Sequence, residues 1–423
     1  MEAWKALETE TKQKLTNLFT AGLLFWISIT LLLPTLPTYI QFMGGTTQQV
    51  GIVMSSFAIG LIASRTWLGK VADSRSRKIV ILIGAAVAAL APVGYLLVRS
   101  IIGLACIRAF HGISIAAFTI GYSALVVDLA PLKYRGTLIG YMNLAVPIGM
   151  SMGPALGGFL QASGKQFVAN GTGYEVLFLI SLICGGLALL LSSRIKESPL
   201  PVMESSQQSN QSVSKRTFWQ LTKDPSLLVP TIVLLLIGLV FGSLAAFLPL
   251  FIKELQLDFN VGFFYTVVAI ASFSVRLFVG RASDRYGRGL FISGALICYI
   301  ISMVLLARAD TIVMFILSAI AEGSGAGILI PLILALVSDR SYATERGRVF
   351  ALCMGGFDVG IAMGGLVLGS LSGILGGYRG IFSLAAILAS VALVIFVTQA
   401  GKNVRHSLFF ALGKAKDAYA MNK

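Results

Sequence analysis

Charged residues are scarce in this chain of 423 residues, where Asp, Glu, Lys and Arg together make up 12%. A soluble protein carries roughly 25% charged residues, whereas 56% of this chain is hydrophobic. The apolar residues form blocks of about 20, and each block can cross the hydrocarbon of a bilayer as a helix. Because twelve such blocks cannot share one water-soluble core, the scarcity of charge excludes a soluble globular protein.

Cysteine is also rare, and the four cysteines lie in four different apolar blocks, at Cys106, Cys184, Cys298 and Cys353. No pair has the spacing of metal ligands or of a disulfide framework, so we interpret them as small packing residues and predict no metal and no cofactor. The nucleotide-binding pattern G-x4-G-K-[ST] is absent, which leaves nucleotide-driven pumping unsupported. No cleavable signal peptide is evident at the start of the chain.

Positive charge exceeds negative charge by 15, which raises the question of nucleic-acid binding. The cations lie in short turns between apolar blocks, a distribution typical of membrane topology rather than of a nucleic-acid-binding face. Most of them fall on one side if the N-terminus is placed in the cytoplasm. The positive-inside rule therefore predicts that both termini are cytoplasmic. The few cations of the opposite turns are Arg99, Lys165, Lys253, Arg308 and Arg379.

The spacing of the apolar blocks predicts an all-α integral membrane protein with twelve helices in two six-helix bundles. The first six run near 17–41, 48–68, 79–98, 101–127, 137–160 and 174–193, and the second six near 226–252, 259–280, 290–307, 311–338, 348–370 and 379–400. The stretch ESPLPVMESSQQSNQSVSK between them predicts a flexible linker. The predicted segments are a cytoplasmic N-terminal segment (1–16), a bundle (17–193), a linker (194–225), a second bundle (226–400) and a cytoplasmic tail (401–423).

The two halves repeat each other at an offset of 211 residues, as from Gly69 to Gly280. The same offset relates further pairs: Asp73 and Asp284, Arg77 and Arg288, Arg65 and Arg276, Asp128 and Asp339, Arg135 and Arg346, and Gly149 and Gly360. An offset that holds across four helices indicates an internal repeat. Both halves start on the same side of the membrane, so these are parallel repeats, and such repeats place a substrate site between the halves near mid-depth.

The turn GRASDRYGR resembles the signature between helices 8 and 9 of the major facilitator superfamily, and GKVADSRSRK resembles its signature between helices 2 and 3. The resemblance covers nearly the whole chain, although Ser76 stands where the superfamily usually has Gly. It implies the major facilitator fold and a conformational gate made by Gly69, Asp73, Arg77, Gly280, Asp284 and Arg288. It also implies that Asp73 braces its turn against the start of helix 11, and Asp284 its turn against helix 5.

Helix 5 carries a glycine pattern, GYMNLAVPIGMSMGPALGGF, with glycines at Gly140, Gly149, Gly153, Gly157 and Gly158 and a proline at Pro154. Three of these glycines are four residues apart, so they form one strip that lets a neighbouring helix approach closely. Proline removes a backbone hydrogen bond and is expected to bend the helix. A plain packing interface is the alternative interpretation. The full pattern G-x8-G-x3-G-P-x2-G-G resembles the antiporter motif of drug:proton antiporters, which implies antiport.

Ionisable residues inside the predicted helices are few, and each is a candidate functional residue because charge is costly in a membrane. Helix 4 carries Arg108 and His111 on one face, in a stretch that resembles the superfamily motif R-x-x-Q-G with His in the Gln position. The resemblance links Arg108 to proton coupling, and a structural cation bonded to carbonyls is the alternative. His111 fits a hydrogen-bonded neutral histidine as well as a proton carrier.

Two acids lie about 15 Å from the starts of their helices, near mid-depth. They are Glu322 in helix 10, the repeat partner of His111, and Asp358 in helix 11. A carboxylate at that depth can bind and release a proton during transport, or can form a fixed ion pair with Arg108. We predict that at least one of the two acids couples protons to transport, and the sequence leaves open which one.

Bulky aromatic residues in helices 1 and 7 are candidates for a substrate cavity: Phe25, Trp26, Phe241 and Phe247. Lipid-facing or packing positions are the alternative for each. Apolar walls with few charges suit lipophilic or amphipathic compounds. The sequence therefore predicts a monomeric, multi-pass carrier of the cell membrane, not an enzyme, which exports small molecules in exchange for protons. A specific metabolite exporter (siderophore, lipid or amino acid) is the alternative, and a non-transporting scaffold or receptor a remote one.

Overall fold

The computed structural model describes residues 4, 7–131, 134–164, 173–195, 218–342 and 345–421, and throughout these ranges the regular structure is helical. Within the helices, the side chains of residues 66, 73–74, 135–137, 162–164, 218–219, 281, 284 and 346 are not described. Most of the predicted linker, at 196–217, lies outside the described residues, as do the first three residues of the chain.

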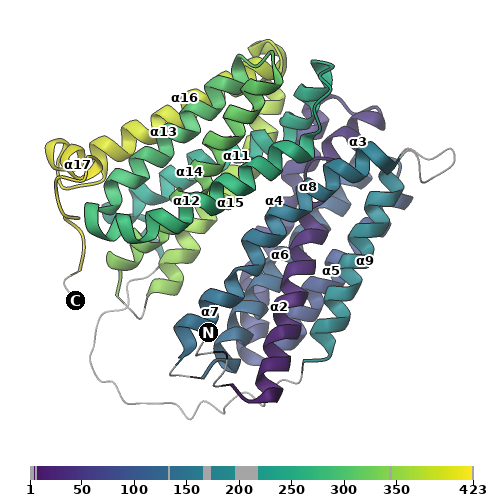
Figure 1. The fold of residues 1–423 in the computed structure, drawn as a ribbon, viewed down its shortest axis with the longest axis horizontal. Coiled ribbons are helices and arrows are strands. Elements are labelled where there is room, and N and C mark those ends of the chain that lie inside the picture. Colours follow the sequence, from purple (N-terminus) through teal and green to yellow (C-terminus); the bar gives the residue numbers. More distant parts are fainter. Residues whose placement is uncertain are drawn as a thin grey trace. The chain divides into compact units, whose positions relative to one another are not determined.

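The N-terminal half contributes eight described helices (Figure 1). They are α2 (Thr9–Thr30), α3 (Leu36–Phe42), α4 (Thr47–Ser74), α5 (Arg77–Leu97), α6 (Ile101–Leu129), α7 (Arg135–Asn143), α8 (Ala145–Gly164) and α9 (Tyr174–Ser193). The predicted helices 3, 4 and 6 match α5, α6 and α9 to within about two residues at each end.

The C-terminal half also contributes eight described helices. They are α10 (Phe218–Thr222), α11 (Pro225–Glu254), α12 (Val261–Tyr286), α13 (Arg288–Ala307), α14 (Ile312–Asp339), α15 (Arg346–Leu375), α16 (Tyr378–Gln399) and α17 (Val404–Ala411). Two of them, α10 and α17, lie outside the six predicted spans, in the segments interpreted from sequence as linker and tail.

Ten of the described helices are long and apolar enough to cross a membrane. The two remaining predicted spans, 17–41 and 137–160, are each interrupted, so the prediction of one continuous helix there is wrong. Prolines explain both breaks, because Pro34 has no N–H for the carbonyl of Thr30, where α2 ends, and Pro147 has none for that of Asn143, where α7 ends. By contrast, α8 runs without a break through Pro154.

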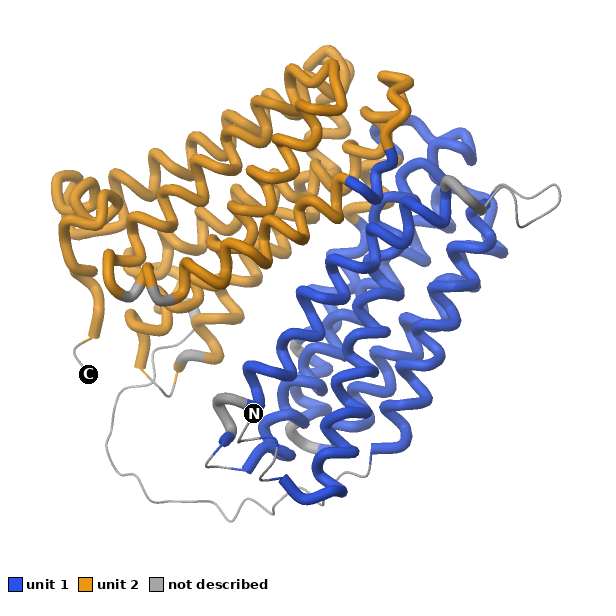
Figure 2. The backbone as a smooth tube through the Cα atoms, viewed as in Figure 1, with its two compact units in different colours: residues 1–49, 56–210, 260–263 blue, residues 50–55, 211–259, 264–423 orange. Residues whose placement is uncertain are grey.

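The chain forms two compact units (Figure 2). The first comprises residues 1–49, 56–210 and 260–263, and the second residues 50–55, 211–259 and 264–423. Inside the first unit, Phe25 of α2 stacks on Phe118 of α6, with ring centroids 3.8 Å apart. Inside the second, Phe251 of α11 packs beside Phe315 and Phe382 of α14 and α16. The exact domain boundaries given above stay a prediction.

Candidate functional site

The first candidate site is a buried cation on α6. Ser100 caps this helix by accepting a hydrogen bond from the backbone N–H of Gly103 at 3.1 Å, which fixes the start of α6. The next two turns carry Arg108 and His111 toward the interior, where Arg108 is 5% exposed and His111 is fully buried. The two residues are three positions apart and so lie on one face of the helix, as the sequence predicts.

Aromatic side chains surround this cation. The guanidinium of Arg108 lies over the ring of Phe57 from α4, 4.3 Å from its centroid. The same ring meets His111 edge-on at 5.7 Å, and the Tyr95 hydroxyl lies 3.2 Å from Nδ1 of His111. Arg108 also acts on Tyr95 through its charge and a side-chain hydrogen bond. The sequence interpretation missed Tyr95, although a tyrosine inside an apolar span is itself a signal.

Polar atoms of this cluster lack partners. Among the described residues, Nε and Nη1 of Arg108 and Nε2 of His111 are buried without a hydrogen-bond partner. No described carboxylate forms an ion pair with Arg108 either. A buried donor without a partner destabilises the fold by about 1–3 kcal/mol, so these atoms retain hydrogen-bonding capacity that no described residue satisfies.

The second candidate site is a buried carboxylate on α14. Glu322 is 2% exposed, and its Oε2 atom has no hydrogen-bond partner among the described residues. Tyr265 of α12 and Tyr299 of α13 are close enough to feel its charge, and the buried Tyr265 hydroxyl also lacks a partner in the described part of the chain. No described Lys or Arg forms an ion pair with Glu322. The sequence interpretation did not single out either tyrosine.

The other candidate acid, Asp358, lies on α15. It is only half-buried, so Glu322 is the more deeply buried of the two acids. The neighbouring Phe357 approaches Phe241 of α11, with ring centroids 6.1 Å apart. Asp358 therefore lies beside a partly exposed aromatic pair.

The predicted gate residues form one ion pair in each half. Arg77 at the start of α5 pairs with Asp128 at the end of α6, and Arg288 at the start of α13 pairs with Asp339 at the end of α14, at 2.5 Å in the second case. The side chains are equally exposed in both pairs, 23% for Arg and 35% for Asp. The sequence interpretation missed these partners, although all four residues share the repeat offset.

The side chains of Asp73 and Asp284 lie outside the described residues, so their predicted bracing role stays a prediction. Gly69 and Gly280 lie within α4 and α12, which continue past the predicted ends to Ser74 and Tyr286. The two turns close differently. Ser76 is extended and caps α5 by accepting from the backbone N–H of Ile79 at 3.1 Å, whereas Gly287 has a φ of +93°. The serine thus replaces a left-handed glycine with a helix cap.

The glycine strip of α8 packs against α2. A Cβ at Gly153 would meet Thr30 and the backbone of Leu31, and one at Gly149 would meet Trp26. Gly157 faces the carbonyl of Leu31, and the hydroxyl of Thr30 donates to the carbonyl of Gly149 at 3.1 Å. Two helix backbones can approach so closely only where the residue at the contact is glycine, which has no Cβ.

The remaining motif residues differ in setting. Gly158 and Pro154 are buried, whereas Gly140 on α7 faces open space. The cavity candidates also divide, because Phe25 and Phe247 are fully buried and Trp26 and Phe241 are partly exposed. Phe247 lies 6.2 Å from Tyr378 between ring centroids. The partly exposed pair is better placed to contact a solute, and all four remain predictions.

Two repeats of membrane-crossing helices, with ionisable residues buried inside α6 and α14 and an ion pair at the end of each of these two helices, are the features of a multi-pass membrane transporter. The sequence model of the Major Facilitator Superfamily matches residues 18–307 and 258–411. The chain therefore belongs to the Major Facilitator Superfamily. The predicted all-α fold and the interpretation as a transporter of small molecules rather than an enzyme are confirmed.

Named relatives match over nearly the full length. The chain is 26% identical to multidrug resistance protein MdtG of Klebsiella pneumoniae (strain 342), covering 94% of this chain and 97% of the relative. It is also 26% identical to MdtG of Serratia proteamaculans (strain 568), covering 88% and 90%. The similarity therefore extends over both halves of the chain.

Solved structures share the fold. The nucleoside transporter NupG superposes with a TM-score of 0.74 at 17% identity, covering 90% of this chain and 99% of NupG. A bacterial homologue of the human lysosomal transporter Spinster has a TM-score of 0.74 at 16% identity, covering 99% and 100%. At such low identities the likeness establishes the architecture, and the substrate has to be argued from the site.

Proposed function

We propose that this protein exports lipophilic or amphipathic small molecules from the cell in exchange for protons, by alternating access. The full-length similarity to proteins named for multidrug resistance supports the substrate class. The glycine pattern of α7 and α8, in which Gly149, Gly153 and Gly157 pack against α2, supports exchange rather than symport, since the pattern resembles that of drug:proton antiporters.

The observation that carries the proposal is the burial of Glu322 without a counter-ion. A carboxylate away from water is stable as the neutral acid and costly as the anion, unless a cation or hydrogen-bond donors compensate it. Within the described residues Oε2 of Glu322 has no donor, so the site favours a bound proton. The proton leaves when water or a cationic solute reaches the carboxylate, which links proton release to a change of access.

Arg108 supports the coupling from the other half. Its guanidinium is a fixed positive charge in the first unit, and no described carboxylate forms an ion pair with it. Such a charge discourages a second cation from occupying that unit and orients anionic or polar groups of a solute toward α6. Trp26 and Phe241, both partly exposed, supply apolar contact surface for a lipophilic solute.

Topology and assembly follow as parts of the same proposal. The excess of cations in one set of turns supports an orientation with both termini in the cytoplasm of a bacterial inner or other cell membrane. Export then moves solutes from the cytoplasm outward, driven by protons that enter. Because each chain carries both repeats and both buried centres, one chain contains all the groups that the exchange requires, and we expect a monomer.

Counterflow in liposomes tests the proposal. The purified protein is reconstituted, a proton gradient is imposed, and lipophilic dyes, nucleosides, amino acids and siderophores are compared in parallel. We expect gradient-dependent accumulation of several lipophilic cations, with proton movement reported by an enclosed pH-sensitive dye. Accumulation of a single metabolite class would favour the specific exporter instead, and transport without proton movement would exclude antiport.

A further inference from the structure

The segment after α16 is folded onto the second unit. Gly401 donates its backbone N–H to Oγ of Ser407 at 2.8 Å, and Oδ1 of Asn403 accepts from the backbone N–H of His406 at 2.8 Å, which starts α17. Phe410 of α17 packs on Phe396 of α16, with ring centroids 6.0 Å apart. α17 therefore lies beside the end of α16, one of the helices long and apolar enough to cross a membrane (Figure 1).

One face of α17 is apolar and exposed. Val404 and Leu408 of α17 and Leu412, which directly follows the helix, are four residues apart and so share a face, and they are 63%, 44% and 48% exposed. The side chains that pack on the unit, Ser407 and Phe410, are buried on another face. An eight-residue helix with an uncovered apolar row at this position has the pattern of a helix that lies in the membrane interface.

Cations flank this apolar row: Lys402, Arg405, Lys414 and Lys416. None of them forms an ion pair within the part of the chain that the structure describes. The guanidinium of Arg405 lies over the ring of Phe409, 5.8 Å from its centroid, so this cation is held beside an apolar side chain of α17. The row and its cations together complement the acyl chains and the charge of an anionic lipid.

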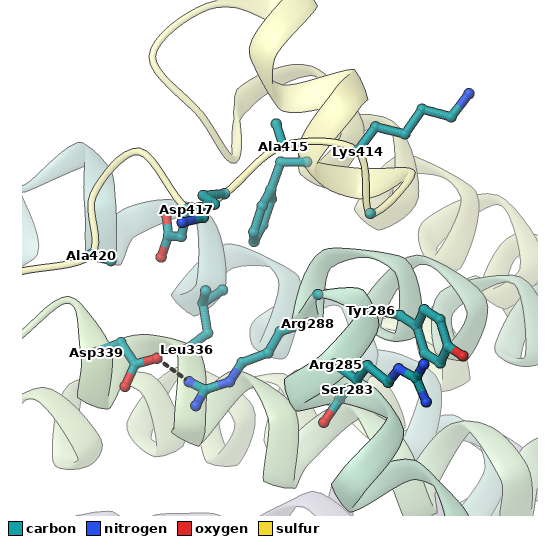
Figure 3. A pocket seen from close by; sticks show the side chains of 14 residues that line it. Ser283, Arg285, Tyr286, Arg288, Leu336, Asp339, Lys414, Ala415, Asp417 and Ala420 are labelled. Atoms are coloured by element: carbon teal, nitrogen blue, oxygen red, sulfur yellow. Dashed lines mark ion pairs between the residues drawn. The ribbon is translucent and has the colours of Figure 1, made fainter.

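The tail also closes a pocket against the loop between α12 and α13 (Figure 3). The cavity has a volume of about 580 Å³, and the charged residues of its lining are Arg285, Arg288, Asp339, Lys414, Lys416 and Asp417. Both carboxylates are engaged, because Asp339 pairs with Arg288 and Asp417 with Arg340. The lining thus retains three cations without a carboxylate partner among the described residues. They are Arg285, Lys414 and Lys416.

Arg340 fixes the tail over this pocket. It is 1% exposed and donates to both carboxylate oxygens of Asp417 at 2.8 Å, and also to the carbonyls of Ser226 and Ala400 at 2.8 and 2.9 Å. The tail turns at Gly413, whose φ is +72° and where a Cβ would lie 2.7 Å from the carbonyl oxygen of Tyr286. The two hydrogen bonds between the buried Arg340 and Asp417 therefore hold the cations of the tail at the pocket rim.

We propose that α17 and this pocket form a binding site for an anionic phospholipid. The apolar row of α17 rests in the acyl boundary, and Arg285, Lys414 and Lys416 neutralise the phosphate of the headgroup. In this structure Lys414 extends outward from the tail (Figure 3), where its flexible side chain can reach a headgroup at the membrane surface. A lipid accounts for the apolar row as well as for the cations, whereas a soluble phosphate accounts for the cations alone.

The test uses the full-length protein in nanodiscs of phosphatidylcholine that contain a small fraction of spin-labelled phosphatidylglycerol. Electron paramagnetic resonance measures the fraction of label that the protein immobilises. We expect the double variant Lys414→Gln/Lys416→Gln to weaken retention by about five-fold for each cation removed. The matched control Lys253→Gln/Arg308→Gln removes two exposed cations from the opposite set of turns and is expected to retain the lipid.

Two further arms identify the source of the phosphate. Leu408→Ser/Leu412→Ser keeps the cations and should also release the lipid, while soluble glycerol 3-phosphate should not compete for it. We expect the variants to remain folded, because Arg340 and Asp417 are unchanged. Thermal unfolding checks this. Unchanged retention in the lysine variant overturns the proposal. If glycerol 3-phosphate displaces the labelled lipid and Leu408→Ser/Leu412→Ser leaves lipid retention unchanged, the lipid assignment is overturned in favour of a soluble phosphate.

Discussion

The two halves bury opposite charges at related positions. In the N-terminal half, α6 buries Arg108 and His111 against Phe57 and Tyr95. In the C-terminal half, α14 buries Glu322 at the position that His111 occupies in the repeat. The same helical frame thus presents a cation in one half and an acid in the other, and we propose that the acid binds the coupled proton.

At their ends, by contrast, the halves are alike. The pairs Arg77–Asp128 and Arg288–Asp339 join the same repeat positions and are equally exposed. We propose that the equal ion pairs stabilise the scaffold and that the unequal buried charges couple protons to transport. This contrast can be tested with variants whose effects range from loss of transport to small changes in stability.

The largest effect is expected from Glu322→Gln. The amide keeps the shape of the side chain but cannot bind and release a proton, so gradient-driven accumulation should fall to background while downhill exchange continues. His111→Gln, at the same place in the other half, should reduce accumulation far less, because an amide can still hydrogen-bond the Tyr95 hydroxyl. Accumulation and exchange assays in liposomes measure both. Equal losses in the two variants would remove the distinction between the halves.

Buried arginines should differ in their contribution to stability. Arg340→Met leaves Asp417 and two carbonyls without their donors, and breaking such a buried pair destabilises by about 3–5 kcal/mol. Arg108→Met loses the contact with Phe57, which contributes about 2 kcal/mol or less, and a hydrogen bond with Tyr95, whose hydroxyl keeps His111 as a partner. Unfolding of the purified variants in detergent measures the difference. A larger loss at Arg108 would indicate that a partner compensates its charge.

The glycine interfaces of α8 with α2 and of α15 with α11 form the next test. A Cβ at Gly153 meets backbone of α2, and one at Gly364 meets the backbone of Ser243 at 3.0 Å. We expect Gly153→Ala and Gly364→Ala each to destabilise by about 1–3 kcal/mol through overpacking. Gly140→Ala is the control, because its Cβ would enter open space. Thermal unfolding compares the three, and a cost at Gly140 equal to the others would argue against close packing as the cause.

The smallest effects should come from the terminal ion pairs. Both pairs are partly exposed, so Arg77→Gln and Arg288→Gln should each lower the free energy of unfolding by about 0.5–1 kcal/mol. The two losses should be similar in size. Chemical unfolding at low and high salt measures them, with smaller differences at high salt. Clearly unequal costs would show that the two turns have separate roles in gating.

Much of the fold could be predicted from the sequence, because apolar runs of membrane length and a repeat offset are local signals. The spans of α9 and α13 agree with prediction to within two residues. The breaks before α3 and α8 were not predicted, although Pro34 and Pro147 explain them. A proline in the sequence shows only that one backbone N–H is missing. The surrounding packing decides whether the helix continues, as it does at Pro154.

Less of the candidate site could be predicted. Arg108, His111 and Glu322 stand out because charge inside an apolar run is rare. Their neighbours Phe57, Tyr95 and Tyr265 come from other helices, and their proximity depends on tertiary packing. The ion pair between Arg340 and Asp417 joins residues that are far apart in the sequence. Nothing in the local pattern of a basic tail indicates that its one aspartate is held by a buried arginine.

Proton release on substrate binding tests the central claim, that Glu322 is the proton site, most directly. The purified protein is placed in weakly buffered detergent solution with a pH indicator, and a dye that it transports is added. We predict that the wild-type protein and Asp358→Asn release protons in proportion to the dye bound, and that Glu322→Gln binds the dye without releasing protons. Undiminished release from Glu322→Gln, or its loss in Asp358→Asn alone, would contradict the account.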